Sequence, residues 1–270
     1  MIIIQPKTPD YYEITRAAID EPSSRVLDES ATYKLEVREL KMSLYYVNDE
    51  QIEALVKGAA ENLIDQPSSQ QMLKRIVYLT IDDGPTSSAP KFLDLLKRYG
   101  IKVTFFVLEP NVRRYPEAVK RMLAEGHILG IHGVTHDKDK FYRSKESLLH
   151  EVERTRKTIK EVSGVDTVLV RTPYGSVPFM TPTYKKVLED NGYKMWDWNI
   201  DTRDWYFGDL RYVASAISQL KNLGNNEAPV ILIHDRVATV EYLPELLDYL
   251  LANNYEFGTL RKEMKPVQLY

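Results

Sequence analysis

From residue 75 onwards, apolar runs of strand length alternate with amphipathic stretches of helical period. The first run, 76–81, is mostly apolar and β-branched and leads directly into Asp82, Asp83 and a Gly-Pro turn, which is typical of a strand buried on both faces. Further strands are expected at 101–108, 127–132, 168–170, 193–199, 230–233 and 256–259, and helices at 90–99, 116–125, 145–162, 182–191, 212–223 and 242–252. This alternation indicates βα units around a parallel sheet, arranged as a barrel or as an open sheet.

Five of the twelve glycines follow the amphipathic stretches in nearly equivalent places. They are Gly100, Gly126, Gly164, Gly192 and Gly224. A glycine just past the end of a helix adopts the left-handed conformation without steric cost, so we predict that these five residues cap the preceding helices.

Residues 1–70 have a different pattern. A strand is expected at 32–37, a second possible strand at 44–47, and then a helix capped by Asn48 or Asp49 with apolar residues at helical spacing up to Leu63. A polar segment with the composition of a linker follows. The sequence therefore predicts a small α+β appendage at 1–70, without visible chemistry, and a larger domain at 71–270.

Composition and charge exclude some binding partners and some kinds of site for this protein. The formal net charge of -3 leaves no basic excess to neutralise phosphates, which argues against nucleic acid. The chain has no cysteine, so disulfides and thiolate metal sites are excluded. No run approaches the roughly 18 apolar residues of a membrane span. The first five residues are too short for a signal peptide, so we expect either a protein made without one or a trimmed chain.

Polar residues gather where the predicted strands end. Because the carboxyl ends of parallel strands lie at one edge, we expect the following residues to converge there: Asp82, Asp83, His132, His136, Arg171, Asp201, Asp204 and His234. Two histidines and one aspartate would form a three-ligand site for zinc or a similar divalent ion, leaving one position open for water, as in catalytic sites. The remaining acid and histidine would then serve as a base and an acid.

Five segments of this region resemble the motifs of the NodB-homology polysaccharide deacetylases, carbohydrate esterase family 4. They are Thr80-Ile-Asp-Asp-Gly84, His132-Gly-Val-Thr-His136, Arg171-Thr-Pro-Tyr-Gly175, Asp201-Thr-Arg-Asp-Trp205 and Leu232-Ile-His234. The resemblance covers about residues 75–260 and implies a distorted (β/α) barrel with fewer than eight strands. We therefore predict an α/β fold, a distorted barrel of about seven parallel strands with the small N-terminal appendage.

The resemblance also implies roles for single residues. Asp83, His132 and His136 would hold one divalent metal ion, with zinc expected and cobalt, nickel or manganese as alternatives. Asp82 would be the general base, oriented and kept ionised by Arg171. His234 would be the general acid, tuned by Asp204.

Three further residues would contact the substrate. The resemblance implies that the backbone N–H of Tyr174 completes an oxyanion hole and that Trp205 and Leu232 line a pocket for the acetyl methyl group. Hydrolysis would begin with water deprotonated by Asp82 and end with protonation of the sugar amine by His234.

The chain departs from the family pattern at a few positions. Gly133 replaces the Ser or Thr whose hydroxyl usually braces the loop between the histidines, which leaves the rigidity of that loop open. Thr172 replaces Pro and Ile81 replaces Phe, both as packing changes. Asp83 is retained where relatives acting on muramic acid often have Asn, which favours N-acetylglucosamine as the substrate.

Several other residues have a structural interpretation beside a functional one. His127 is expected to be a buried structural residue, His150 a surface residue, and Trp196 and Trp198 core residues. Tyr142 would either stack on a sugar or belong to an ordinary surface loop. The charged run 151–160 is expected to be a solvated helix face.

The function expected from the sequence is therefore metal-dependent removal of acetyl groups from N-acetylglucosamine units of a polysaccharide, with peptidoglycan first and chito-oligosaccharides second. Two alternatives stay open: a catalytically silent carbohydrate-binding relative, and a deacetylase of another amide or ester. We expect a monomer without a membrane span, acting outside the cell or at the cell envelope.

Overall fold

The computed structural model describes residues 2–8, 11–16, 32–36, 75–224 and 227–269, and the chain divides into two compact units, 1–71 and 72–270. In the smaller unit, three strands form an antiparallel sheet in the order β1-β2-β3: β1 (Ile2–Thr8), β2 (Tyr11–Arg16) and β3 (Thr32–Glu36). The third matches the strand expected at 32–37, whereas the first two were not predicted. The expected strand at 44–47 and the helix after it lie outside the described residues.

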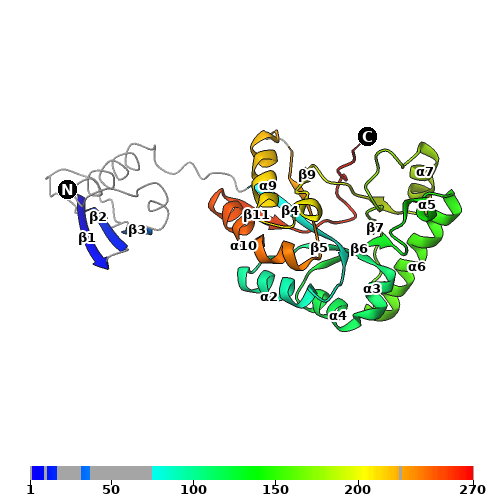
Figure 1. Cartoon of the computed structure of the whole chain (residues 1–270), viewed down its shortest axis with the longest axis horizontal. Helices are drawn as coiled ribbons and strands as arrows, with labels where there is room; N and C mark the ends of the chain where they lie inside the picture. Colours follow the sequence, from blue (N-terminus) through cyan, green and yellow to red (C-terminus); the bar gives the residue numbers. More distant parts are fainter. Residues whose placement is uncertain (1, 9–10, 17–31, 37–74, 225–226, 270) are drawn as a thin grey trace, which may run out of the picture. The chain divides into compact units, whose positions relative to one another are not determined.

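Seven parallel strands of the larger unit follow one another in the order β8-β7-β6-β5-β4-β10-β9, and an eighth, β11, pairs with the first part of β4 (Figure 1). They are β4 (Arg75–Gly84), β5 (Thr104–Leu108), β6 (Ile128–Gly133), β7 (Leu169–Val170), β8 (Lys194–Met195), β9 (Ile200–Asp201), β10 (Val230–His234) and β11 (Tyr255–Gly258). The prediction of a distorted (β/α) barrel is confirmed.

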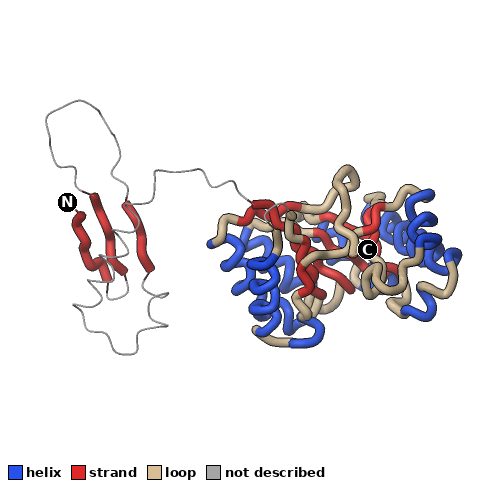
Figure 2. The backbone as a smooth tube through the Cα atoms, turned by 90° about the horizontal axis from the view of Figure 1, so that it is seen from above, coloured by secondary structure: helices blue, strands red, loops and turns tan. Residues whose placement is uncertain are grey.

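The helices flank these strands on both sides, as Figure 2 shows for the larger unit. They are α2 (Ala89–Tyr99), α3 (Glu109–Arg114), α4 (Pro116–Ala124), α5 (Lys138–Phe141), α6 (Lys145–Ser163), α7 (Pro182–Asp190), α8 (Asp204–Phe207), α9 (Arg211–Asn222) and α10 (Val237–Ala252). The six expected helices are present, and α10 begins earlier than predicted. The short helices α3, α5 and α8 were missed because four to six residues are too few to display a 3.6-residue period. Within the described ranges, no helix has the length and apolar character needed to cross a bilayer.

The central strand β4 is buried as its sequence predicts. Val77, Leu79 and Ile81 are fully buried, and Thr80 on the other face is also buried and donates its hydroxyl to the Ile231 carbonyl at 2.7 Å. Because β4 is held in the core, Asp82 and Asp83 have fixed positions at its carboxyl end.

The predicted strand 193–199 is instead two short strands that lie at opposite ends of the sheet order, β8 next to β7 and β9 next to β10. The segment between them, residues 196–199, crosses the gap between the two edge strands β8 and β9, which we call the seam of the barrel. The Trp196 N–H donates to the Val170 carbonyl at 2.8 Å, and the Asn199 N–H donates to the Val230 carbonyl at 3.2 Å. The C-terminal segment packs along it, because the Asp197 N–H donates to the Val267 carbonyl at 2.8 Å.

Two predictions about the helices need correction. Gly100, Gly126, Gly164 and Gly192 have positive φ angles as expected, but Gly224 does not, because α9 ends in an extended Leu223 with φ −71° and ψ 134°. The charged run on α6 is not solvated throughout, since Glu151 is only 6% exposed.

Candidate active site

The predicted site residues meet at the carboxyl ends of the parallel strands, around one pocket. Its lining consists of Asp82, Asp83, His132, His136, Thr172, Tyr174, Trp198, Asp201, Trp205, Leu232, His234 and Arg236. Eight of the ten residues singled out for catalysis, substrate or metal are in this set. The other two, Arg171 and Asp204, lie behind it and contact lining residues.

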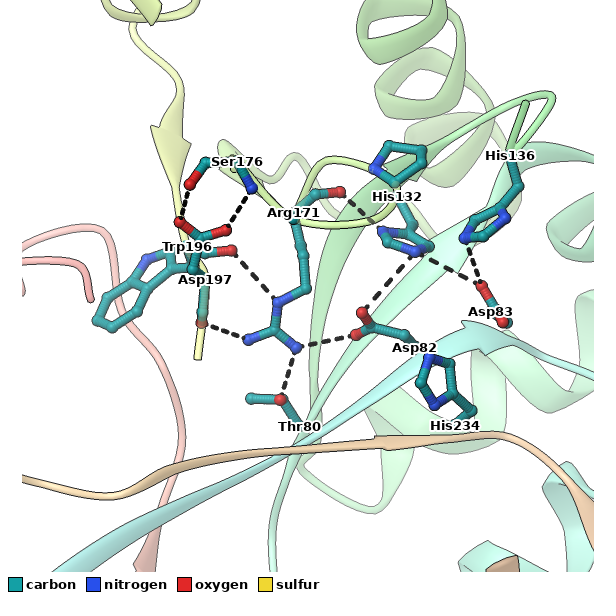
Figure 3. A network of polar contacts seen from close by, with 12 residues as sticks. Thr80, Asp82, Asp83, His132, His136, Arg171, Ser176, Trp196, Asp197 and His234 are labelled. Carbon is teal, nitrogen blue, oxygen red and sulfur yellow. Dashed lines mark hydrogen bonds and ion pairs between the residues drawn. The ribbon is translucent and has the colours of Figure 1, made fainter. Parts of the chain in front are cut away.

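Asp83, His132 and His136 form a cluster whose ligand-type atoms lie within 4.8 Å of one another. Oδ1 of Asp83 is 3.5 Å from Nε2 of His132 and 3.3 Å from Nε2 of His136 (Figure 3). Nδ1 of His132 is 2.7 Å from the Arg171 carbonyl oxygen, to which it donates, so Nε2 is the free ligand nitrogen. One nitrogen anchored and the other directed at a shared centre is the arrangement of a metal-binding histidine.

The charges of this cluster fit a divalent cation. Oδ1 of Asp83 is buried and has no hydrogen-bond partner within the described part of the chain. Burial raises the pKa of Asp83, but the close approach and charge of His132, together with the charges of His136 and His234, hold it well below its usual range. Although burial lowers the pKa of His132, the Asp82 and Asp83 charges raise it above its ordinary value. The pocket therefore favours positive charge, and three ligands leave room for a water or a substrate oxygen.

Left-handed backbone conformations are concentrated around the pocket. Asp83, His136, Tyr174 and Arg203 have φ angles of 69°, 47°, 65° and 57°. Such conformations cost about 1–3 kcal/mol each in a residue with a side chain and persist where the surroundings enforce them. They direct side chains that an ordinary strand-to-loop connection would place elsewhere.

Arg171 connects Asp82 to the barrel wall. Its Nη1 donates to Asp82 Oδ1 at 2.9 Å and to Thr80 Oγ1 at 2.6 Å (Figure 3). The other nitrogens donate to two carbonyls of the seam, Nε to Trp196 at 3.2 Å and Nη2 to Asp197 at 2.8 Å. Since the guanidinium is fully buried and fixed by four acceptors, it holds Asp82 in one orientation.

On the other side of the pocket, Asp204 anchors His234. Oδ1 of Asp204 accepts from Nδ1 of His234 at 2.8 Å, and Oδ2 accepts from the His234 N–H at 2.8 Å and from Thr239 Oγ1 at 2.6 Å. Burial lowers the pKa of His234, but the hydrogen bond and charge of Asp204, with the charges of Asp82 and Asp83, raise it above its ordinary value. His234 therefore faces the pocket through Nε2 in a form suited to donating a proton.

Three predicted substrate contacts line the rest of the pocket. Leu232 is buried, whereas Trp205 and Tyr174 are about half exposed. The Tyr174 hydroxyl donates to the His136 carbonyl at 3.0 Å, and the two rings lie 4.8 Å apart. Among the described residues, no acceptor takes the Tyr174 N–H, so this donor is available to a ligand.

Three residues that line the pocket were not placed there from the sequence: Thr172, Trp198 and Arg236. Trp198 packs against the buried cluster that contains Trp196, as expected, but it also lines the pocket, where its ring lies 5.5 Å from the Arg171 guanidinium. Thr172, interpreted from the sequence as a packing change, is buried and also lines the pocket. Arg236, two residues after His234, was not singled out, although a cation just past a catalytic strand was a usable signal.

Other residues behave as structural elements. Nδ1 of His127 accepts from the Val103 N–H at 3.2 Å, and His127 is buried, as expected. His150 is exposed. The Tyr142 hydroxyl donates to the carbonyls of Pro173 and Gly175 at 2.9 and 3.0 Å, so it supports the Tyr174 loop rather than projecting as a sugar platform.

Comparison with known proteins identifies the family of the chain. The family model described as polysaccharide deacetylase matches residues 69–196. YheN of Bacillus subtilis, itself only provisionally named a polysaccharide deacetylase, is 39% identical over 91% of this chain and 85% of its own length. A peptidoglycan-N-acetylglucosamine deacetylase of Bacillus cereus is 34% identical over 70% of this chain and 71% of its own.

Solved structures give the same result. The polysaccharide deacetylase Bc1974 from Bacillus cereus superposes with a TM-score of 0.67 at 32% identity, covering 73% of this chain and 97% of that one. A carbohydrate esterase family 4 (CE4) esterase of Streptococcus mutans gives a TM-score of 0.65 at 27% identity, covering 70% and 87%. The chain therefore belongs to the polysaccharide deacetylase family, carbohydrate esterase family 4.

Proposed function

We propose that this protein is a metal-dependent hydrolase that removes the N-acetyl group from N-acetylglucosamine residues of a cell-wall polysaccharide, peptidoglycan first and chito-oligosaccharides second. The observation that carries the proposal is one pocket in which the Arg171-bound carboxylate of Asp82 and the Asp204-bound imidazole of His234 accompany the Asp83–His132–His136 cluster. A base, an acid and a cation site are what amide hydrolysis needs.

Asp83, His132 and His136 would hold the cation, with zinc proposed and cobalt, nickel or manganese as alternatives. Such an ion, when bound, supplies Lewis acidity to the acetamide carbonyl and lowers the pKa of water.

Asp82 is the proposed general base. Oδ1 of Asp82 accepts a hydrogen bond from Arg171. Oδ2 of Asp82 lies 3.7 Å from Nε2 of His132, on the side of the Asp83–His132–His136 cluster. A carboxylate fixed in this way takes a proton from the attacking water without having to reorient.

His234 is the proposed general acid. Asp204 holds its Nδ1–H, so Nε2 delivers the proton to the departing sugar nitrogen. As the carbonyl oxygen gains negative charge, the free N–H of Tyr174 donates to it, and Leu232 and Trp205 enclose the acetyl methyl group.

The names of the relatives support the substrate class, since several are called peptidoglycan-N-acetylglucosamine deacetylases. A peptidoglycan substrate would place the protein outside the cell or at the cell envelope, and we propose that it acts there, as a monomer.

Acetate release tests the proposal. The full chain, loaded with zinc, is incubated with peptidoglycan and with chito-oligosaccharides, with and without chelator, beside Asp82→Asn and the surface control Asp139→Asn. We expect release that the chelator and Asp82→Asn abolish and that Asp139→Asn leaves unchanged. Zinc binding without release from either polymer would overturn the deacetylase proposal, and release that survives the chelator would overturn metal dependence.

A further inference from the structure

The loop that connects His132 to His136 has an unusual backbone. Gly133 has a φ of 98° and His136 a φ of 47°, so the segment between the two histidines departs from extended geometry at both ends. A loop in this conformation needs an external support to keep both imidazoles directed at Asp83.

Glu151 supplies contacts of this kind from α6. Its Oε2 accepts from the N–H groups of Val134 at 2.9 Å and Thr135 at 3.0 Å, and its Oε1 accepts from Thr135 Oγ1 at 2.7 Å. The side chain thus binds the two residues in the middle of the loop with both oxygens.

The burial of this carboxylate is otherwise uncompensated. Glu151 is 6% exposed and forms no ion pair with a described Lys, Arg or His. A buried carboxylate is costly unless its oxygens accept hydrogen bonds, and here the three donors all belong to the loop. The three hydrogen bonds therefore stabilise the buried carboxylate and restrain the loop at the same time.

Gly133 makes room for this arrangement. A Cβ at this position would lie 3.2 Å from Oε2 of Glu151 and 3.0 Å from Cε2 of Phe141. A side chain at position 133 would therefore crowd the Glu151 carboxylate and the Phe141 ring, and glycine leaves both in place.

We propose that Glu151 is a positioning residue for the metal site, holding the 133–136 loop so that His136 keeps its place beside His132 and Asp83. The inference rests on the proposed function, in which the two histidines bind the cation. It concerns the pre-organisation of the ligands, not the chemical step.

The helix that carries Glu151 does not depend on it. Leu148, Val152 and Ile159 are fully buried on the same helix. Removal of the carboxylate is therefore expected to loosen the loop and to leave α6 in place.

Zinc affinity and amide exchange test the proposal on the full chain. The affinity is measured by competition with a chromophoric chelator for Glu151→Ala, Glu151→Gln and the exposed control Glu153→Ala on the same helix. We expect Glu151→Ala to weaken zinc binding about 10- to 100-fold, as for other residues that orient metal ligands. The zinc affinity of Glu151→Gln should lie between those of Glu151→Ala and the unsubstituted protein, because the Gln amide oxygen still accepts the two backbone N–H groups. The zinc affinity of Glu153→Ala should match that of the unsubstituted protein.

Hydrogen exchange of the metal-free protein gives a second readout. We expect the Val134 and Thr135 amides to exchange faster in Glu151→Ala while the amides of α6 stay protected. Zinc affinity within two-fold of the unsubstituted protein in both Glu151 variants would overturn the inference. If the unsubstituted protein binds no zinc, the proposed metal function fails, and unchanged exchange at Val134 and Thr135 would then overturn the positioning role on its own.

Discussion

Nη1 of Arg171 donates to Oδ1 of Asp82 at 2.9 Å, and both side chains are almost completely shielded from solvent. The ion pair thus joins β4 to the residue that directly follows β7, and these two strands are not neighbours in the sheet. A charge of either sign left without its partner here would be poorly solvated.

Arg171→Met is expected to destabilise the protein by about 3–5 kcal/mol, because it leaves the carboxylate of Asp82 buried without its partner. Urea unfolding measures the free energy of unfolding of each variant. The double variant Arg171→Met/Asp82→Asn should recover part of this loss, since neither charge remains, while acetate release stays absent. A double variant as unstable as Arg171→Met would show that the arginine acts through its carbonyl contacts alone.

Asp204→Asn is expected to shift the pH dependence of kcat. The carboxylate raises the pKa of His234, and a general acid works only while it is protonated, so activity is lost as pH rises through that pKa. Without the carboxylate charge the pKa falls, and the alkaline limb should move to lower pH by about 1–2 units. The kcat profile on chito-oligosaccharide from pH 5 to 10 measures this, and an unshifted alkaline limb would contradict the role of His234.

His127 is expected to make stability depend on acid pH. Burial, with a contribution from Lys102, lowers the pKa of His127 from 6.5 to about 4 in the folded protein. The unfolded chain therefore binds the proton more readily, and stability that is fully present above pH 6.5 is lost as pH falls towards 4, by about 3 kcal/mol in total.

The matched variant is His127→Asn, which keeps an acceptor near the Val103 N–H but does not titrate. It should be less stable than the unsubstituted protein at pH 7.5, and the difference should shrink as the pH is lowered to 4. Urea unfolding at several pH values measures both curves, and parallel curves would contradict the assignment of the acid-sensitive step to His127.

Arg236→Ala is expected to alter substrate preference. Arg236 is an exposed cation in the pocket lining, and its side chain has no ion pair or hydrogen bond to any other described residue. Peptidoglycan carries the carboxylates of its stem peptides, whereas chito-oligosaccharides are neutral. We expect kcat/KM on peptidoglycan to fall about two- to five-fold, the effect of an exposed charge pair, with little change on chito-oligosaccharides.

The comparison is made at low and high salt, with Lys97→Ala on α2 as a control cation outside the pocket. The effect on peptidoglycan should diminish at high salt because exposed charges are screened. Equal losses on both polymers would contradict a charge-based preference.

The parts of the fold that could be predicted are those whose signal is local in the sequence. The apolar run of β4 and the glycines after four helices identify their elements without knowledge of the rest of the chain. Parallel pairing then places Asp82, His132 and His234 at one edge. The side chains in the candidate site follow from strand ends and motif positions.

What could not be predicted depends on tertiary contacts. Glu151 looks like one charge among many on a solvated helix, and only the three-dimensional structure shows that its carboxylate meets the loop of another segment. Trp198 packs against the buried core as its strand pattern predicts, but it also lines the pocket beside the barrel seam, where strand pairing is interrupted. Periodicity carries no information about either of these contacts.

The seam has a consequence for protein engineering. The carboxylate of Asp197 accepts from the Leu269 N–H at 2.9 Å and from Ser176 Oγ at 2.6 Å, while the carbonyl of the same residue accepts from Arg171. Residues 267–269 are thus linked through Asp197 and Arg171 to Asp82, the proposed general base. Affinity tags, fusion partners or protease trimming at residues 267–269 would act directly on the barrel closure, so purification handles belong elsewhere on the polypeptide.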